Sequence, residues 1–163
     1  MNTSTRTAGF STVDLGNMSN AGIIFYSVFM FIGASPTSTG GGIKTTTFLV
    51  VLMALYSYIS ENKTSLFKRT LPKDLLHKAF VIFSIGIGTV VSALLLLSLS
   101  NPTIPLKDLI FESVSAFATV GLSTGITPSL SIIGKLVIIV TMFIGRVGPL
   151  TIVSLWILKK NNG

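Results

Sequence analysis

The sequence predicts an all-α integral membrane protein, and its composition and its long uncharged stretches are the first two reasons. Of the 163 residues, 49% are apolar and only 10% are charged, whereas a soluble domain carries charge on about a quarter of its residues. Residues 79–99 contain no charge, and residues 136–158 contain only Arg146. Each stretch is long enough to cross a hydrocarbon core of about 30 Å as a helix.

A repeat is the third reason, and it predicts a duplicated unit. TAGFST at residues 7–12 returns as TVGLST at residues 119–124, and MFIG at residues 30–33 returns as MFIG at residues 142–145. Both pairs are separated by 112 positions. The shared offset indicates a unit in which a Thr-x-Gly turn precedes a long apolar helix by a fixed distance.

The first copy consists of a turn and a broken helix. A helix is expected from Ser19 or Asn20, either of which can cap it, through residue 33. A proline and three consecutive glycines then interrupt it at residues 34–42, because neither residue type continues a helix cheaply. A second helical piece follows at residues 43–59. The two pieces together are long enough to cross a bilayer once.

The second copy is more complete. A spanning helix is expected at residues 80–99, and a helical pattern too short to span follows at residues 106–119. The second turn and a final helix at about residues 131–159 complete it. This order predicts a re-entrant pore unit, with Glu112 anchoring the short helix against the back of the turn. Six residues precede Thr7 in this sequence, so the chain is expected to hold about one and a half units.

The basic residues favour a membrane topology over nucleic-acid binding, although the net charge is +7. They concentrate between residues 61 and 78 and at Lys159 and Lys160. Basic residues beside membrane helices mark the cytoplasmic side, so both segments are expected there; a binding patch for an anionic partner is the alternative. There is no cysteine, which excludes disulfides and thiolate metal sites, and His77 has no second metal ligand at useful spacing.

The two turns carry the chemistry. Potassium-selective pores replace the hydration shell of the ion with backbone carbonyls from Thr-Val-Gly-type turns, and glycine permits the positive φ that such turns need. The alternative is that both are merely extracellular turns between helices. The predicted filter residues are Thr7, Ala8, Gly9, Phe10, Thr119, Val120, Gly121 and Leu122.

The interruption at residues 34–42 is predicted to be a gate. Non-helical backbone at membrane depth is tolerated only where protein buries it or a water-filled cavity meets it. Arg146 would be a costly cation inside a spanning helix, and we expect it to bind carbonyls of this segment and add a positive barrier below the filter. Lys44 either lines the cavity or extends to the cytoplasmic interface. The remaining predicted gate residues are Ser35, Pro36, Thr37, Ser38, Thr39, Gly40, Gly41 and Gly42.

Four motifs resemble the C-terminal part of the Ktr/Trk/HKT superfamily of potassium transporters, closest to the bacterial KtrB-type translocating subunit. They are TRTAGFST at 5–12, GASPTSTGGGIKTTT at 33–47, FESVSAFATVGLSTG at 111–125 and FIGRVGP at 143–149. The resemblance implies four non-identical membrane-pore-membrane units around one pore. Residues 1–60 would end the third unit, residues 61–78 would be a cytoplasmic loop, and residues 79–163 would form the fourth.

The resemblance also implies a function and partners. It implies a multi-pass protein of the bacterial plasma membrane with the filter side extracellular, which transports K⁺, possesses no covalently bound cofactor and is not an enzyme. Na⁺ as a coupling ion stays open. A homodimer of full subunits and a cytoplasmic KtrA-type nucleotide-binding regulatory subunit are the implied partners. The alternatives are a non-conducting truncated or accessory membrane protein, and a pore made of two copies of this chain.

Overall fold

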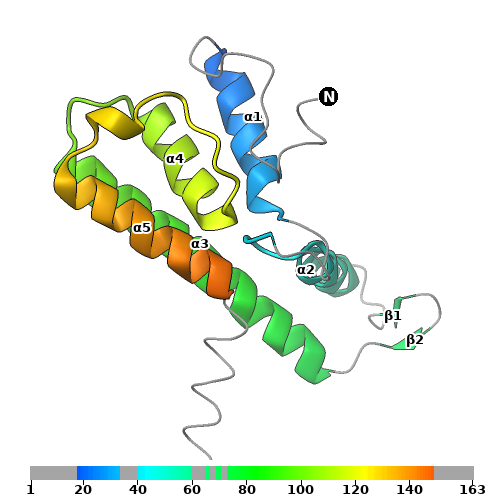
Figure 1. Cartoon of the computed structure of the whole chain (residues 1–163). Helices are drawn as coiled ribbons and strands as arrows, with labels where there is room; N and C mark the ends of the chain where they lie inside the picture. Colours follow the sequence, from blue (N-terminus) through cyan, green and yellow to red (C-terminus); the bar gives the residue numbers. More distant parts are fainter. Residues whose placement is uncertain (1–17, 34–39, 60–64, 67–68, 71–72, 149–163) are drawn as a thin grey trace, which may run out of the picture.

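The computed structural model describes residues 18–33, 40–59, 65–66, 69–70 and 73–148. Within these ranges the protein is helical, as predicted, apart from one small antiparallel hairpin of β1 (Ser65–Leu66) and β2 (Arg69–Thr70). Figure 1 shows the elements in order. The helices are α1 (Asn20–Phe31), α2 (Thr45–Ile59), α3 (Lys73–Ser100), α4 (Leu106–Ala118), the 3₁₀ turn η2 (Thr127–Ser129) and α5 (Ile132–Val147).

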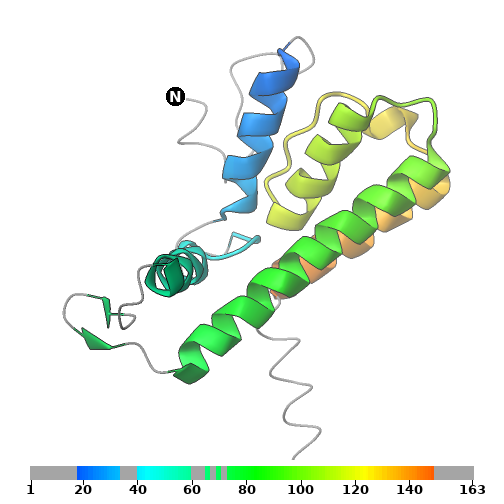
Figure 2. The same cartoon turned by 180° about the vertical axis from the view of Figure 1, so that it is seen from behind.

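Helix α4 lies at the centre of the fold, and every residue from 111 to 118 is buried. Helix α1 packs on one side of it, and α3 and α5, which run antiparallel to each other, pack on the other (Figures 1 and 2). One apolar core joins α1 to α4 and the turn that follows α4; it contains Ile23, Tyr26, Met30, Phe111, Val114, Ala118, Val120 and Leu122. A second core joins α4 to α3 and α5; it contains Leu97, Leu109, Ala116, Leu130 and Ile138.

The chain passes along α4 and returns beside it. In Figure 1 the segment after α4 runs back between α4 and α1 to η2, close to the end of α4 at which the helix began. Buried Asn101 ties α3 to α5 at this same end, because its Oδ1 accepts a hydrogen bond from the Ser131 N–H at 2.8 Å. The short helix and the return segment therefore form a hairpin between longer helices.

One described helix, α3, is long and apolar enough to cross a membrane by length and composition, over Leu75–Ser100. Its 26 residues correspond to about 39 Å at 1.5 Å per residue. Large apolar side chains are also exposed on other helices, including Phe25, Tyr58 and Phe143. A soluble monomer rarely exposes so much apolar surface, which agrees with the membrane protein that the composition predicts.

The interruption between α1 and α2 is present where the sequence predicts it. Ser19 caps α1, with its side chain accepting a hydrogen bond from the Gly22 N–H, and α1 ends at Phe31. The Gly33 N–H donates to the Ile43 carbonyl at 2.8 Å, and the Ile43 N–H donates to the Phe31 carbonyl. These two bonds bring the ends of the interruption together. Residues 34–39 between them lie outside the described residues.

Two helix boundaries differ from the sequence prediction. Helix α3 begins at Lys73, several residues before the expected start at residue 80, so the predicted 61–78 loop includes a hairpin and the first turns of α3. Hydropathy marks where a helix becomes apolar. Residues 73–78 (KDLLHK) are more polar, but their two lysines and two leucines are good helix formers.

The prediction of one continuous final helix to residue 159 is wrong. Helix α5 ends at Val147, and Gly148 follows with φ 80° and its N–H bonded to the Ile144 carbonyl. The next residue, Pro149, disfavours a helical conformation in the residue before it. Residues 149–163 lie outside the described residues.

Candidate functional site

The turn after α4 has an unusual backbone. Thr119 has φ 53° and ψ 38°. Among the described residues, it is the only one other than glycine with a positive φ. Gly121 follows with φ 81°, a conformation that glycine adopts readily and other residues rarely do. The Thr119 and Val120 N–H groups both donate at 3.1 Å to carbonyls in the last turn of α4, those of Ala116 and Ser115. The turn is therefore joined rigidly to the helix end.

The side chains of the turn are buried while its glycine lies open. Val120 and Leu122 are each 5% exposed and belong to the core against α1. Gly121 is exposed, and a Cβ added to it would meet nothing within 4 Å. The Ser115 hydroxyl donates to the Leu122 carbonyl at 2.6 Å. Apolar side chains thus hold the turn, and its backbone at Gly121 is left facing open space.

Glu112 anchors the segment that follows the turn, as the sequence predicts. This carboxylate is 5% exposed, and its Oε1 accepts hydrogen bonds from the Ser123 hydroxyl and, at 2.9 Å, from the Thr127 hydroxyl. Ser123 also accepts from the Gly125 N–H at 2.9 Å. One buried acceptor on α4 therefore fixes the return segment at two positions.

Replacing Glu112 with alanine is expected to destabilise the protein by about 2–3 kcal/mol, because two hydroxyls lose their acceptor in a buried position. Glu112→Gln keeps an acceptor oxygen at the same place and is expected to lose less than half as much. Thermal unfolding of the purified variants in one detergent measures this difference. Equal midpoints for wild type and Glu112→Ala would show that the cluster contributes nothing to stability.

Three glycines meet below the turn. A Cβ added at Gly41 would lie 2.6 Å from the Thr119 Oγ1 and 3.0 Å from the Gly145 carbonyl oxygen. The Gly41 N–H donates to the Thr119 Oγ1 at 2.9 Å. A Cβ at Gly42, which has φ 79°, would lie 3.4 Å from the Cα of Ala118. Residues 40–42 therefore pack directly between the start of the turn and the end of α5.

The repeated MFIG motif ends at two positions of close backbone contact. A Cβ at Gly145 would overlap the Phe117 carbonyl group, lying 2.8 Å from its carbon. A Cβ at Gly33 would overlap the Gly41 carbonyl in the same way and lie 3.2 Å from the Cα of Gly42. Sequence analysis did not assign these two glycines a role, although the repeat itself was the signal that could have identified them.

The two predicted cations lie at the lower end of this site. The Lys44 Nζ donates to the Gly40 carbonyl at 2.8 Å. Arg146 lies in the last turn of α5 and is exposed in this chain rather than buried as expected. Its bonding to carbonyls of the 34–42 segment stays a prediction.

The described residues therefore unite the second turn with the lower part of the predicted gate. Thr119, Val120, Gly121 and Leu122 lie in the turn, and Gly40, Gly41 and Gly42 lie beneath it. Among the described residues there is no cluster of three or more carboxylate, imidazole or thiol side chains that could bind a metal ion. The potential cation ligands at this site are therefore carbonyl and hydroxyl oxygens. Outside the described residues lie Thr7, Ala8, Gly9, Phe10, Ser35, Pro36, Thr37, Ser38 and Thr39.

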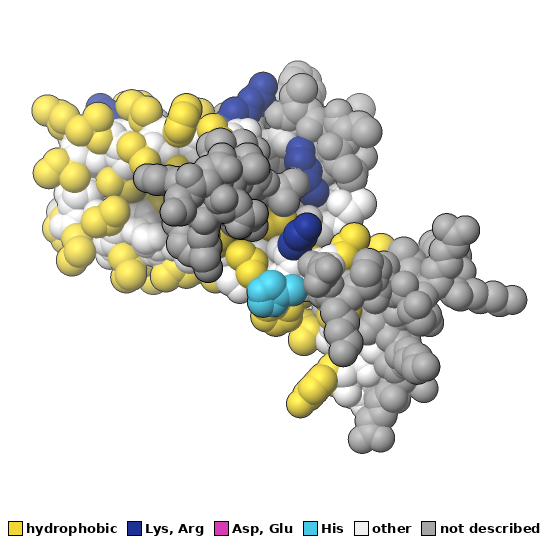
Figure 3. Space-filling view, turned by 90° about the horizontal axis from the view of Figure 1, so that it is seen from below, with side chains coloured by type: hydrophobic (Ala, Val, Ile, Leu, Met, Phe, Trp, Pro, Cys, Tyr) yellow, Lys and Arg dark blue, Asp and Glu magenta, His cyan; other side chains and the backbone are white. Residues whose placement is uncertain are grey.

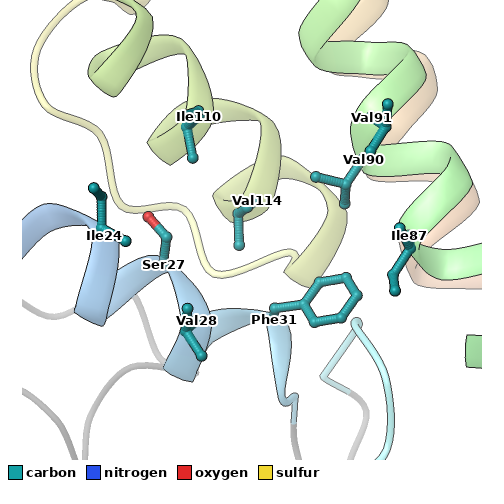
Figure 4. A pocket seen from close by; sticks show the side chains of 9 residues that line it. All are labelled: Ile24, Ser27, Val28, Phe31, Ile87, Val90, Val91, Ile110 and Val114. Atoms are coloured by element: carbon teal, nitrogen blue, oxygen red, sulfur yellow. The ribbon is translucent and has the colours of Figure 1, made fainter.

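A separate groove of about 260 Å³ lies between α1, α3 and α4 (Figure 4). Eight of its nine lining side chains are hydrocarbon, including Phe31, Val90 and Val114. The exception is Ser27, whose hydroxyl donates to the Ile23 carbonyl at 2.8 Å. A dehydrated cation needs several oxygen ligands, so this groove is not an ion site.

Comparison with known proteins defines the class as cation transport proteins. The model of the TrkH family, described as "Cation transport protein", matches residues 1–162. The chain belongs to this membrane-embedded transporter family.

Similar curated proteins support the same family. The chain is 46% identical over 155 residues to the Ktr system potassium uptake protein D of Bacillus subtilis, covering 94% of this chain and 34% of that protein. It is 42% identical to protein B of the same system, covering 91% of this chain and 33% of that protein. It is 39% identical to the potassium/sodium uptake protein NtpJ of Enterococcus hirae, covering 99% and 37%. The chain thus spans about a third of the length of these relatives.

Proposed function

We propose that this chain supplies filter turns and part of the gate of a potassium uptake subunit. The observation that carries the proposal is the turn from Thr119 to Leu122, in which buried side chains hold an open backbone at Gly121. The turn follows the carboxyl end of α4, where the helix dipole places about half a negative charge. Carbonyl oxygens at such a position suit a dehydrated monovalent cation. The potassium uptake relatives support K⁺ as the ion.

The proposed architecture is a re-entrant pore unit. Helix α4 and its return segment form the pore loop between α3 and α5, and the first turn at residues 7–10 belongs to the preceding unit. Residues 1–60 end the third of four units, residues 61–78 connect the two, and residues 79–163 form the fourth. The central position of α4 and the return of the chain beside it support this arrangement (Figure 1).

The segment 34–42 is proposed to gate the ion path below the filter. The contacts of Gly41 and Gly42 with Thr119 and Ala118 support this placement. Glycine allows this segment to approach the turn closely. Because glycine has no side chain, it also lowers the barrier to a conformational change of the backbone. Lys44, bonded to the Gly40 carbonyl, adds a positive charge at the same level.

Arg146 is proposed to add a positive barrier to the same path. Arg146→Gln is then expected to raise the K⁺ flux of the assembled transporter about threefold or more, because a like charge near the path repels the ion. The flux is measured as Rb⁺ uptake by cells, normalised to the amount of protein in the membrane. Lys135→Gln, at an exposed position near the start of α5, is the control. Unchanged flux in Arg146→Gln would contradict the barrier.

The proposed orientation places the 61–78 loop and the C-terminus in the cytoplasm and the filter side outside. Viewed from below, Lys and Arg side chains interrupt the hydrophobic surface, and no Asp or Glu side chain of the described residues shows on that face (Figure 3). Basic residues favour the cytoplasmic side. The proposed partners are a second full subunit and a cytoplasmic KtrA-type nucleotide-binding subunit, with Na⁺ as a further coupled or transported ion.

The test is complementation of bacteria that lack potassium uptake. We expect a chimera, in which this chain replaces the matching third of the B. subtilis Ktr protein D, to restore growth at low K⁺. The chain expressed alone is expected not to restore it. If the chimera reaches the membrane in normal amount but gives no growth, the alternative of a non-conducting accessory protein is favoured.

A further inference from the structure

The hydroxyl of Thr119 holds two elements that the proposed function treats separately. Thr119 begins the filter turn, and its Oγ1 accepts the N–H of Gly41, which is 78 positions away in the sequence, at 2.9 Å. This hydrogen bond joins the described gate residues 40–42 to the turn. The bond places the positive end of an amide dipole on the first side-chain oxygen of the filter.

The surrounding contacts make this bond specific. Gly41 has no room for a side chain, since a Cβ would lie 2.6 Å from the Thr119 Oγ1 and 2.8 Å from its Cγ2. Gly42, at φ 79°, lies against Ala118, and the Lys44 Nζ bonds the carbonyl of Gly40. The amide of Gly41 is therefore aimed at Thr119 by the groups on both sides of it.

A hydroxyl oxygen has two lone pairs, so one is used by Gly41 and one is left for an ion. A cation on the second lone pair would face the amide hydrogen across a single oxygen atom. Like partial charges at such a separation repel each other strongly where water is excluded. Resting on the proposed function, we propose that Thr119 couples the filter to residues 40–42, with a bound cation and the Gly41 amide opposing each other at its hydroxyl.

Coupling of this kind is reciprocal. If the docked amide weakens cation binding at Thr119, the cation must weaken docking of the amide by the same factor. Rising K⁺ would therefore release residues 40–42 from the turn, and low K⁺ would favour their docking. Thr119 is in this sense a positioning residue as well as a filter residue.

Hydrogen exchange of the Gly41 amide in the purified chimera tests the coupling, because this N–H is itself the donor. Exchange of the peptide that contains residues 40–44 is measured by mass spectrometry in K⁺ and in choline at equal ionic strength. We expect K⁺ to speed exchange at Gly41 about fivefold, the factor that corresponds to one hydrogen bond. Thr119→Val is expected to exchange fast in both salts, and Thr119→Ser, which keeps the oxygen, to behave as wild type.

Thr89→Val is the matched control, because it removes a hydroxyl that donates to the Ile85 carbonyl within α3. It is expected to leave the K⁺ effect intact. Equal exchange in K⁺ and choline for the wild-type chimera, or a K⁺ effect that persists in Thr119→Val, would overturn the coupling. If Thr119→Val does not assemble, the comparison of K⁺ with choline in the wild-type chimera still decides, since equal exchange in the two salts overturns the coupling. Uptake by the same wild-type chimera tests the proposed function separately, so uptake without a K⁺ effect on exchange rejects the coupling alone.

Discussion

Gly145→Ala is expected to prevent stable packing of α5 on α4. An alanine Cβ at this position would overlap the Phe117 carbonyl and lie 2.8 Å from its carbon and 3.1 Å from the Cα. The neighbour is backbone in the buried part of α4, residues 111–118, so it cannot rotate away as a flexible side chain would. Overpacking of this kind costs about 1–3 kcal/mol and sometimes more. Phe117 lies two residues before Thr119, at which the filter turn begins. The turn would therefore move with it.

The measurement is the fraction of detergent-extracted protein that remains monodisperse after heating, together with K⁺ uptake. We expect most of the Gly145→Ala protein to be no longer monodisperse after heating. We also expect its K⁺ uptake to be at least tenfold lower than that of the wild type. Gly88→Ala is the matched control, since Gly88 also lies in a helix and a Cβ there would meet nothing within 4 Å. It is expected to be neutral or slightly stabilising, because alanine favours helix over glycine. Equal behaviour of the two variants would contradict the close contact.

Gly121→Ser is expected to impair ion discrimination without preventing assembly. Gly121 has φ 81° and open space around it, so serine meets no neighbour. Serine at this φ is strained by about 1–2 kcal/mol. The strain is relieved by rotating the peptide groups on either side, which turns carbonyls away from the ion path. We expect the preference for K⁺ over Na⁺ in uptake to fall about tenfold.

Gly125→Ser separates this effect from backbone strain in general. Gly125 has φ 96° and equally open surroundings, but it lies beyond the turn. Its replacement carries similar strain and is expected to leave the ion preference unchanged. The comparison is made by Rb⁺ uptake in competition with Na⁺. An equal loss of preference in both variants would mean that strain in the return segment, rather than the carbonyls at Gly121, sets the discrimination.

Local patterns in the sequence predicted most of the helices. The Ser19 cap, the interruption after α1 and the short helix α4 were found within a residue or two, because each depends on neighbouring residues. The ends of α3 and α5 were not. At Lys73 the apolar pattern begins later than the helix does, and at Gly148 a glycine followed by a proline ends a helix whose apolar pattern continues.

The site was predicted in part for the same reason. The turn at Thr119 could be found from its motif and its repeat, because glycine is required locally there. The contact of Gly41 with Thr119 joins residues 78 positions apart, and no local pattern encodes which glycine of a glycine-rich segment meets which hydroxyl. The role of Gly145 depends likewise on a backbone carbonyl of another helix, which only the packed structure reveals.

The central claim, that the turn after α4 helps to form a potassium filter, is tested most directly by ion flux through the purified chimera in proteoliposomes. Rb⁺ entry down an inwardly directed Rb⁺ gradient is followed with and without an equal concentration of Na⁺ outside the liposomes. The proposed filter predicts Rb⁺ entry well above that of empty liposomes, little reduced by Na⁺, and strongly reduced by Na⁺ in Gly121→Ser. Rb⁺ entry no faster than in empty liposomes, or wild-type entry that Na⁺ suppresses as much as in Gly121→Ser, would contradict it.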